Sequence, residues 1–460
     1  MKKFDAIIIG SGQGGTPLAK KLAGAGYKTA LVERRWVGGT CVNDGCTPTK
    51  AMVASAKVLS RVKKSSEFGI HVEKYHTDIQ KIIARQQGIV SSFRSGSEKK
   101  LLSTDHLELI YGEASFTDHK RLRIKSSNNG TQEFTSDLIF IDTGTSPAIP
   151  DIDGIEAIPY LTSSSILELT ELPDHLLIVG GGYVAMEFAQ MYRRFGSNVT
   201  MIVRSERILE REDEDIAQEV SNIFHDENIG VKVNAETLKF TKRSDKITAV
   251  IKLKNKEETI SCSHVLIATG RQPNTATLNL SSTRVDTDQR GFIKVDNQLA
   301  TNVKGIYALG DVNGGPAFTH ISYHDHLIVF NNLVHGKDQT TNGRLVPYCM
   351  YIDPQLGRVG VTEGEARSKG MNIQIAKLPM AHVARGIETG ETRGLMKAII
   401  DKDSKKILGA AILGAEGGEV MSMIEVAMMC GLSYDVLRDG IFAHPTFAES
   451  LNNLFATLKD

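Results

Sequence analysis

The sequence FDAIIIGSGQGG, residues 4–15, decides the fold of the amino-terminal part of the chain. Its apolar half, Phe4–Ile9, predicts a buried strand, and the glycine-rich half leads into a helical stretch that ends at about Gly26. In a Gly-x-Gly-x-x-Gly loop, the first glycine makes a tight turn and the second lets the backbone approach a pyrophosphate. The third lets the helix pack closely on the strand. The stretch therefore predicts the start of a dinucleotide-binding unit.

A strand that ends on an acidic residue completes this unit. Lys28–Glu33 reads as the strand, and Glu33 lies eighteen residues after Gly15. A carboxylate at this place accepts hydrogen bonds from ribose hydroxyls. The strand, loop, helix, strand and acid occur in the order that the fingerprint requires, which favours a nucleotide site over a purely structural unit.

The same pattern occurs a second time. Leu176–Val179 predicts a strand, the loop Gly180–Ala185 follows, and a helix runs to Phe195 before a strand at Val199–Val203. Ala185 takes the place of the third glycine, which is a permitted variant. Two such units in one chain imply two nucleotide sites.

The second unit ends on basic residues, Arg204 and Arg207, where the first ends on an acid. An acid binds a free 2′-hydroxyl, whereas an arginine suits a 2′-phosphate. The pattern therefore favours NADPH over NADH, and a solvated surface arginine is the alternative interpretation.

A cysteine pair stands in GGTCVNDGCTPTK, residues 38–50, which reads as the start of a helix. Four residues separate Cys41 from Cys46, a spacing that allows a disulfide across one helical turn. With no second cysteine pair or nearby histidine, it predicts no metal site. The free backbone donors at a helix start favour a thiolate, which is the nucleophilic form of cysteine. Two buried structural cysteines in a reducing compartment are the alternative.

The composition is that of an ordinary globular protein. The 460 residues suggest two to four domains, and the formal net charge is zero, so no nucleic acid or membrane surface is indicated as a partner. Five scattered cysteines do not resemble a secreted disulfide framework. No apolar run reaches the length of a signal-peptide core or a bilayer span, so we expect a cytoplasmic protein.

The rest of the chain alternates between helical and strand patterns. Beyond a polar stretch at Asn331–Arg344, which we interpret as a boundary, the pattern becomes α+β without another nucleotide loop. Other predicted elements are a helix through Val62, two helical segments within Tyr75–Glu98, strands at Leu107–Phe116, Arg121–Lys125, Glu133–Phe134, Leu138–Thr143, Val265–Ala268 and Ile306–Asp311, and a turn at Asn128–Gly130.

Several motifs in one order resemble a known family, the flavin-dependent pyridine nucleotide–disulfide oxidoreductases, which include glutathione reductase, dihydrolipoamide dehydrogenase and mercuric reductase. The motifs are the two fingerprints, the cysteine stretch, Thr143-Gly144, Ala268-Thr269-Gly270-Arg271, Tyr307-Ala308-Leu309-Gly310-Asp311 and His444-Pro445-Thr446-x-x-Glu449. The resemblance implies an α/β fold with two Rossmann-like domains and an α+β dimerisation domain. Residues 1–150 and 271–342 would bind FAD, 151–270 would bind NAD(P), and 343–460 would form the dimer interface.

The resemblance also implies residue roles. Cys46 would face the flavin and Cys41 the substrate, while Lys50 and Glu187 would form an ion pair near flavin N5. FAD would contact Gly10, Gly12, Gln13, Gly14, Gly15, Glu33, Thr40, Lys50, Ala114, Thr143, Gly144, Asp311, Phe318 and Thr319. NADPH would contact Gly180, Gly182, Tyr183, Val184, Glu187, Arg204, Arg207 and Gly270.

His444 and Glu449 are the predicted acid–base pair for Cys41. Histidine titrates near neutrality, and a carboxylate on one ring nitrogen fixes its tautomer and raises its basicity. In the family this histidine comes from the partner subunit, so the resemblance implies a homodimer.

Within the family the chain is most similar to mercuric reductases and to relatives that reduce copper or answer reactive chlorine. Mercuric reductase carries a cysteine pair at its carboxyl end, whereas this chain has no cysteine after Cys430. Asp44, between the two cysteines, is unusual and either attracts a cation to the disulfide or is an ordinary helix-start acid. We expect an NADPH-dependent FAD enzyme that reduces a metal ion or a disulfide. An NADH-linked dihydrolipoamide dehydrogenase and a flavin-bearing dithiol sensor are the alternatives.

Overall fold

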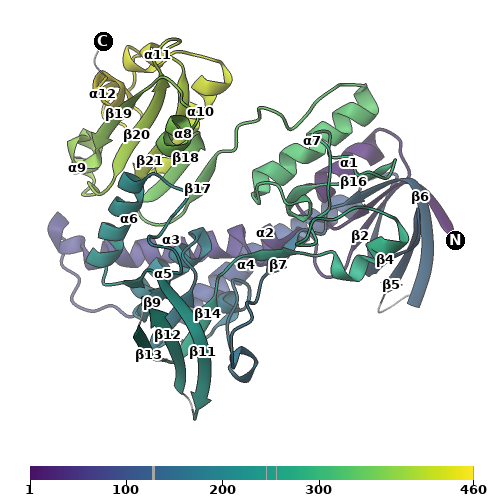
Figure 1. The fold of residues 1–460 in the computed structure, drawn as a ribbon, viewed down its shortest axis with the longest axis horizontal. Coiled ribbons are helices and arrows are strands. Elements are labelled where there is room, and N and C mark those ends of the chain that lie inside the picture. Colours follow the sequence, from purple (N-terminus) through teal and green to yellow (C-terminus); the bar gives the residue numbers. More distant parts are fainter. Residues whose placement is uncertain (127–129, 245, 255, 459–460) are drawn as a thin grey trace.

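The structure is a computed structural model that describes residues 1–126, 130–244, 246–254 and 256–458. Its first unit is built on a seven-stranded sheet with the order β3-β2-β1-β6-β5-β4 and with β16 paired to β6 (Figure 1). Strands β1, β2, β3, β6 and β16 are parallel, and the hairpin partners β4 and β5 are antiparallel. The strands are β1 Lys2–Ile9, β2 Thr29–Glu33, β3 Leu107–Tyr111, β4 Glu113–Asp118, β5 Arg121–Ser126, β6 Gly130–Ile141 and β16 Ile306–Ala308.

Two helices, α1 (Gly15–Gly24) and α7 (Thr319–His335), cover one face of this sheet. Every residue of β2 is buried, as expected for a central parallel strand with both faces covered. Apolar side chains of α1, α7 and the sheet form one continuous core. This core holds the first fingerprint loop at the carboxyl end of β1.

The second unit repeats the arrangement on a smaller scale. Its parallel sheet has the order β10-β9-β8-β14, with β8 His175–Val179, β9 Asn198–Ile202, β10 Gly230–Lys232 and β14 His264–Ile267. Helices α5 (Tyr183–Phe195) and α6 (Glu214–Asp226) pack on it. A separate antiparallel sheet contains β11 Ala235–Arg243, β12 Lys246–Leu253 and β13 Lys256–Cys262. The two crossings to this unit run side by side as β7 (Thr145–Pro147) and β15 (Arg271–Pro273).

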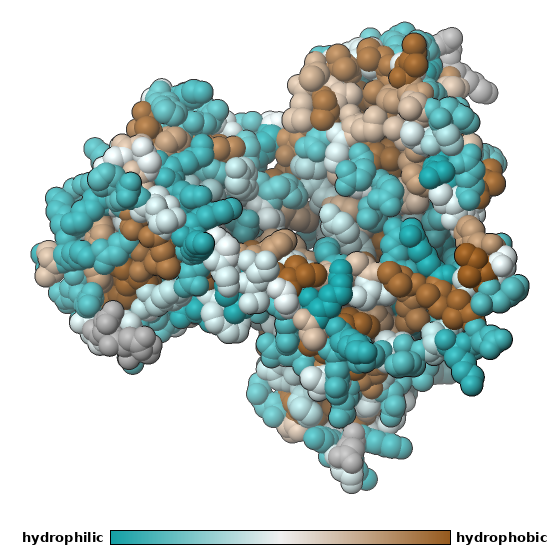
Figure 2. All heavy atoms as spheres, turned by 180° about the vertical axis from the view of Figure 1, so that it is seen from behind, coloured by the Kyte–Doolittle hydropathy of each residue, from teal (hydrophilic) through white to brown (hydrophobic). Residues whose placement is uncertain are grey.

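The carboxyl-terminal unit is an antiparallel sheet with helices against it, which is the α+β pattern that the sequence predicts. The sheet order is β17-β18-β21-β20-β19. The elements are β17 Tyr348–Met350, β18 Gln355–Gly360, α8 Glu363–Ser368, β19 Ile373–Pro379, α9 Ala384–Glu388, β20 Leu395–Asp401, β21 Ile407–Gly414, α10 Gly417–Met429, α11 Tyr434–Arg438 and α12 Ser450–Ala456. Large apolar side chains remain exposed on it, and Figure 2 shows brown surface over this unit. They include Val426, Met429, Leu432, Val436 and Ile441.

The cysteine stretch differs from the single helix that the sequence predicts. Cys41 lies in a short helix, α2 (Gly39–Asn43), and Cys46 begins a second helix, α3 (Cys46–Lys63). The helical conformation is interrupted between Asn43 and Cys46. At Gly45 an added Cβ would lie 2.8 Å from the Thr40 carbonyl oxygen. The two cysteines therefore lie on either side of a helix–helix corner and not within one helical turn, so the prediction that both belong to the start of a single helix is wrong.

Other boundaries also differ from the predicted ones. One helix, α4 (Ile79–Leu102), stands where two helical segments were predicted within Tyr75–Glu98. It starts after Asp78, whose carboxylate accepts a hydrogen bond from the Lys81 N–H and caps it. Leu107–Phe116 is two strands interrupted at Gly112, and the two strands predicted within Glu133–Thr143 are the single strand β6. Helix α7 extends into the predicted boundary as far as His335. The predicted turn at Asn128–Gly130 falls largely outside the described residues.

Helix hydropathy bears on the membrane question. Among the residues that the structure describes, no helix combines the length and the apolar character needed to cross a bilayer.

Candidate functional site

A cavity of about 670 Å³ opens at the carboxyl ends of the first sheet's parallel strands and reaches the starts of α3 and α5. This is where open α/β sheets bind ligands. Of the predicted contacts, Gly10, Gly12, Gln13, Glu33, Thr40, Cys41, Cys46, Lys50, Ala114, Thr143, Gly144, Val184, Glu187, Asp311 and Thr319 line it. Gly14, Gly15, Gly180, Gly182, Tyr183, Arg204, Arg207, Gly270, Phe318, His444 and Glu449 are not among its lining residues.

The first fingerprint loop requires its glycines. Gly10 has φ +104°, and an added Cβ there would lie 2.2 Å from the Asp142 carbonyl oxygen. At Gly15 a Cβ would lie 2.1 Å from the Gly10 carbonyl oxygen, so the helix packs directly on the strand end. At the start of helix α1 the Gly15 N–H already donates to a carboxylate, Asp142 Oδ2. Gly10 and Gly12 line the cavity, so the backbone of the loop can approach a pyrophosphate, the central group of a dinucleotide, at these two glycines.

Glu33 stands at the end of β2, inside the cavity. Its carboxylate accepts hydrogen bonds from the Ser11 backbone N–H at 3.0 Å and the Ser11 hydroxyl at 2.7 Å. The residue is 8% exposed, so the acceptor is fixed in place beside the fingerprint loop. This donor and acceptor set fits the ribose and pyrophosphate of FAD.

Asp142 is a residue of this site that sequence reasoning missed. It follows β6, is 7% exposed, and its Oδ2 accepts the Gly15 N–H at 2.6 Å. Burial raises the pKa of this carboxyl well above its usual range, and the nearby Asp311 and Asp325 add to the effect. An acid just past the end of a buried parallel strand was the available signal. Asp142 anchors the start of α1 beneath the fingerprint loop.

Cys41 and Cys46 are free thiols that share one proton in a hydrogen bond. That bond lowers the pKa of Cys46 to about 6, despite burial, and Thr319 and Lys50 assist. The same bond raises the pKa of Cys41, and burial raises it further. The Thr319 hydroxyl lies 3.4 Å from Cys46 Sγ. Near neutral pH the reduced pair is therefore a Cys46 thiolate and a Cys41 thiol.

This arrangement predicts a thiolate titration with its midpoint at about pH 6. The Cys46 thiolate is present above that pH and is lost as the pH falls through it. Cys41→Ala will move the midpoint upward because it removes the donor that lowers the pKa most, and Thr319→Val will move it less in the same direction. The measurement is the ultraviolet thiolate absorbance of the reduced protein, taken as the difference from Cys46→Ser.

Thr275→Val is the matched control, because the Thr275 hydroxyl donates to the Gly291 carbonyl oxygen at 3.0 Å and not to a sulfur atom. It should leave the midpoint unchanged. A wild-type midpoint near the ordinary cysteine value of about 8.5 would contradict the charge assignment.

Lys50 and Glu187 meet beside the cysteine pair. Lys50 Nζ lies 2.7 Å from Glu187 Oε2, and Glu187 is 5% exposed. Glu187 Oε1 also accepts the Tyr351 backbone N–H at 2.8 Å, while Lys50 Nζ lies 4.9 Å from the Tyr351 ring centroid. Helix α3, helix α5 and the segment after β17 thus fix one ion pair at the cavity wall.

The second fingerprint repeats the tight turn at the first glycine of the first fingerprint. Gly180 has φ +134°, and a Cβ there would lie 2.3 Å from the Ala268 carbonyl oxygen. Gly182, by contrast, has no atom within 4 Å of an added Cβ, so the space above it is open to a ligand. Arg204 is exposed, whereas Arg207 donates through Nη2 to the Glu210 and Glu212 carbonyl oxygens. Arg207 therefore holds its own loop, and Arg204 remains as the candidate phosphate contact.

His444 and Glu449 form a hydrogen-bonded pair. His444 Nδ1 lies 2.8 Å from Glu449 Oε2 and 3.0 Å from Oε1. The His444 side chain is 66% exposed and does not line the cavity of its own chain. The carboxylate leaves Nε2 as the ring nitrogen that faces outward.

Asp44 is paired rather than free. Its carboxylate forms an ion pair with Arg35, whose guanidinium and that of Arg94 lie over the Trp36 ring, 4.4 and 4.1 Å from its centroid. The Asp44 side chain is 15% exposed. Arg35 balances the negative charge of Asp44, which removes the reason to expect that Asp44 attracts a cation. Asp44 is also not an exposed acid at a helix start, because it is largely buried and follows the end of α2.

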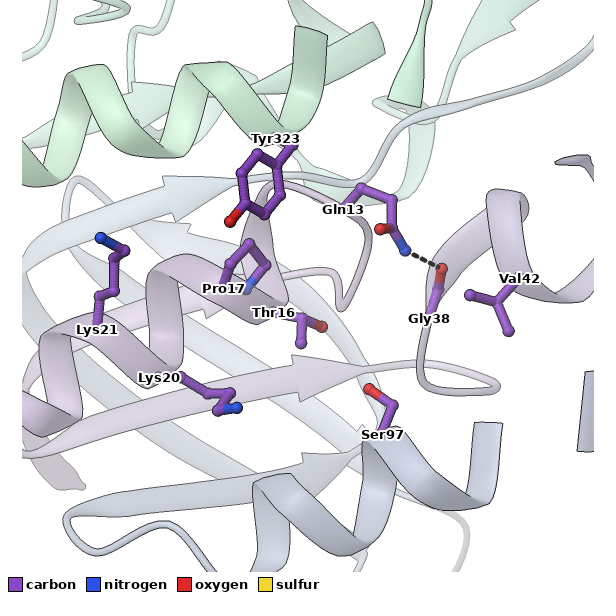
Figure 3. A pocket seen from close by; sticks show the side chains of 9 residues that line it. All are labelled: Gln13, Thr16, Pro17, Lys20, Lys21, Gly38, Val42, Ser97 and Tyr323. Atoms are coloured by element: carbon purple, nitrogen blue, oxygen red, sulfur yellow. Dashed lines mark hydrogen bonds between the residues drawn. The ribbon is translucent and has the colours of Figure 1, made fainter. Parts of the chain in front are cut away.

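A second hollow, of about 430 Å³, lies on the other side of the fingerprint loop (Figure 3). Gln13 Nε2 donates to the Gly38 carbonyl oxygen at 3.3 Å and forms the wall that the hollow shares with the main cavity. The other lining residues are Thr16, Pro17, Lys20, Lys21, Val42, Ser97 and Tyr323. Two lysines, Lys20 and Lys21, make this surface basic.

Among the described residues, no group of three or more histidine, cysteine, aspartate or glutamate side chains could hold a metal ion.

Comparisons with known proteins agree with this geometry. Residues 4–325 match the family model described as pyridine nucleotide-disulphide oxidoreductase, and residues 346–455 match the dimerisation domain of that family. The chain is 37% identical to the probable pyridine nucleotide-disulfide oxidoreductase RclA of Escherichia coli strain K12, covering 100% of both chains. It is 34% identical to a mercuric reductase of Staphylococcus aureus, over 97% of this chain and 81% of the relative.

A solved structure described as the Cu(II) complex of the HOCl-induced flavoprotein disulfide reductase RclA from Escherichia coli is similar as a whole. It has a TM-score of 0.92 and 36% sequence identity, with 100% of both chains covered. The resemblance to the family and the α/β fold with a dimerisation domain are both confirmed. The protein belongs to the pyridine nucleotide-disulfide oxidoreductase family.

Proposed function

We propose that the protein is an FAD-dependent reductase that takes electrons from NADPH and delivers them through Cys41 and Cys46 to a metal ion or disulfide. The observation that carries the proposal is that the fingerprint loop, the Lys50–Glu187 pair and both sulfur atoms line one cavity. FAD, when bound, supplies the hydride acceptor and the electron transfer to sulfur. Residues 1–150 with 271–342, 151–270 and 343–460 are proposed as the FAD, NADPH and dimer domains.

We assign the roles of the individual residues by their positions in the cavity. The first fingerprint, Glu33 and Asp311 would hold FAD, and the second fingerprint would hold the nucleotide. Cys46, whose thiolate is stabilised, would face the flavin, and Cys41 would meet the acceptor. The Lys50 ammonium would place a positive charge near the flavin and lower the Cys46 pKa.

The reduced pair supplies two electrons to its acceptor. With a disulfide, Cys41 attacks one sulfur atom, Cys46 then closes the Cys41–Cys46 disulfide, and two thiols leave with two protons. With Cu(II), two ions become Cu(I) as the disulfide forms and two protons are released. The relatives named for mercury and the Cu(II) complex of RclA support a metal acceptor. Thiolates suit such soft ions.

The proposal includes a homodimer. The match of residues 346–455 to a dimerisation domain and the exposed apolar side chains of α10 and α11 support it. His444 would then act on Cys41 of the partner subunit as the acid–base group, with Glu449 fixing its tautomer. The cytoplasmic location stays a prediction.

Arg204 gives a test of nucleotide choice. Arg204→Ala will raise the KM for NADPH about tenfold, because it removes a charge-assisted contact to the 2′-phosphate, and will leave the KM for NADH within about twofold. Steady-state kinetics with both nucleotides measure this. Arg243→Ala, an exposed arginine on β11, is the matched control and should change neither KM. Equal effects on both nucleotides would contradict the assignment.

The proposed function itself is tested with an acceptor panel under NADPH and under NADH. Hg(II), Cu(II), glutathione disulfide, lipoamide, quinones and oxygen are compared, after anaerobic titration of the flavin. Rapid bleaching by NADPH and steady turnover with a metal or disulfide support the proposal. Preference for NADH and lipoamide favours dihydrolipoamide dehydrogenase. Slow reduction without turnover on any acceptor favours the dithiol sensor.

A further inference from the structure

The ion pair between Arg35 and Asp44 lies on the wall of the main cavity, since both residues line it. Arg35 comes two residues after Glu33, and its backbone N–H donates to Glu33 Oε1 at 2.8 Å. Asp44 lies between Cys41 and Cys46 and directly follows the last residue of α2. The pair therefore links the strand end that carries Glu33 to the corner that carries the two cysteines.

Helix α2 brings Asp44 close to the first fingerprint loop. An added Cβ at Gly39, the first residue of α2, would lie 2.8 Å from Gly12 Cα, so the helix starts in contact with the loop. The Asp44 N–H donates to the Thr40 carbonyl oxygen at 2.9 Å. At 1.5 Å per residue, Asp44 lies roughly 8 Å along α2 from this contact. Charges interact over about this distance at physiological salt, so Asp44 acts on a pyrophosphate bound at Gly12.

The cavity wall carries more acidic than basic side chains, although its proposed occupant is an anion. The acidic residues are Glu33, Asp44, Glu113, Asp142, Glu187 and Asp311. The basic residues are Arg34, Arg35, Lys50 and Arg271. Lys50 is paired with Glu187, and Arg35 is paired with Asp44. Loss of the Arg35 charge would therefore add an unbalanced acid to a cavity that already has an excess of acids.

The negative charge of Asp44 acts inside the cavity. Burial lowers the pKa of Arg271, and the charges of Asp311 and Asp44 oppose this effect. Arg271 is held by two hydrogen bonds to Thr145, from Nε to Oγ1 at 2.6 Å and from Nη2 to the carbonyl oxygen at 2.7 Å. The Asp44 side chain is only 15% exposed, so water screens its charge only in part. Without Arg35, this charge would repel an anion in the cavity.

The loop that carries Arg35 has anchors that do not use the Arg35 charge. The Trp36 ring lies against the Arg94 guanidinium, 4.1 Å from the ring centroid. Arg94 Nε donates to Asn43 Oδ1 at 2.8 Å, and Asn43 Nδ2 donates to the Val37 carbonyl oxygen at 3.0 Å. These contacts tie the loop to α2 and α4. A substitution at Arg35 therefore changes the charge on the cavity wall while the loop keeps its anchors.

We propose that Arg35 is a positioning residue that neutralises Asp44 and so allows an anionic dinucleotide to bind next to the cysteine corner. The inference rests on the proposed function, and it concerns the affinity for FAD and not the transfer of electrons. Arg35 acts on the cofactor through Asp44. Affinity is therefore lost when the acid remains without its cation, and a chain that lacks both charges binds FAD about as well as the wild type.

Arg35→Gln tests this because it removes the cation and keeps a polar side chain. It should raise the Kd for FAD about tenfold or more, since a largely buried, unpaired carboxylate repels a nearby anion. Asp44→Asn should leave the Kd within about threefold or lower it, and Arg35→Gln combined with Asp44→Asn should recover most of the lost affinity. Arg35→Lys keeps the cation and should stay within about threefold. Serial dilution of the purified FAD-loaded dimer, followed by flavin fluorescence as FAD leaves, gives the Kd.

Arg123→Gln is the matched control. The Arg123 side chain is 54% exposed, against 53% for Arg35, and it pairs with Glu133 on a hairpin of the same unit. It lines neither of the two cavities and should leave the Kd unchanged. Salt gives a second readout: between about 0.05 and 0.5 M NaCl the difference between Arg35→Gln and the wild type should shrink, because screening weakens the repulsion. Trp36, the only tryptophan in the sequence, should keep its emission maximum in Arg35→Gln.

The outcomes distinguish this inference from the proposed function. If the wild-type protein binds FAD and Arg35→Gln binds it equally well, the neutralising role is overturned and the reductase stands. The role is also overturned if Asp44→Asn weakens FAD binding as much as Arg35→Gln, or if the double variant binds no better than Arg35→Gln, because both results indicate a purely structural contact. If the wild-type protein binds no FAD, the reductase and this inference both fall.

Discussion

Two inactive variants will restore each other's activity when they share a dimer. Cys41→Ser removes the sulfur that meets the acceptor, and His444→Gln removes the proposed acid–base group, so each homodimer should lose about 100-fold or more of its acceptor turnover. In a mixed dimer one site pairs the intact Cys41 of the His444→Gln chain with the intact His444 of its partner. Each mixed dimer has one complete site of two, so the isolated mixed dimer should recover roughly one half of the wild-type activity, given a symmetric dimer.

The measurement uses two affinity tags to isolate the mixed dimer, followed by steady-state turnover with the best acceptor of the panel. His382→Gln is the matched control, because His382 is exposed and has no carboxylate partner in the described part of the chain. It should keep full activity. Mixed dimers that form and remain inactive would contradict the placement of His444 across the interface.

Local patterns were sufficient for the nucleotide loops. At Gly10 and Gly15 an added Cβ would lie 2.2 and 2.1 Å from backbone oxygen atoms, so the fold allows only glycine there. The glycine spacing can therefore be recognised from the sequence alone. Glu33 could be placed for the same reason, since it ends the adjacent strand. The hydrogen bond between His444 and Glu449 was also predicted from a separation of only five residues. The assigned roles of these residues stay predictions.

One local signal was overlooked: the Asp44-Gly45 dipeptide, which is typical of a turn, lies at the corner between α2 and α3, where Gly45 packs against the Thr40 carbonyl oxygen. Features that depend on contacts between separate elements were missed as well. Asp44 was interpreted alone, and its partner Arg35 became visible only when β2 and α2 were placed together. The hydroxyls of Tyr183 and Tyr348 both donate to Glu212, a contact that joins segments 165 residues apart and leaves no local signal.

The buried ion pairs of Arg194 also join residues that are far apart in the sequence. We expect their loss to lower the free energy of unfolding by a large amount. Arg194, on α5, donates to Glu227 Oε2 at 2.9 Å and Oε1 at 2.7 Å, and to Asp353 Oδ2 at 2.7 Å. Its side chain is 7% exposed. Arg194→Met leaves two largely buried carboxylates short of a cation, which should lower the free energy of unfolding by about 3–5 kcal/mol.

The change is measured from the urea midpoint of the FAD-loaded protein, at fixed protein and FAD concentrations because both ligand and subunit binding shift the midpoint. Arg385→Met is the matched control: Arg385 pairs with Glu388 at 3.1 Å, and both side chains are more than 40% exposed. An exposed pair contributes about 0–1 kcal/mol, so this variant should unfold close to the wild type. Equal midpoints for the two variants would show that the Arg194 network is not what holds the nucleotide unit to the carboxyl-terminal sheet.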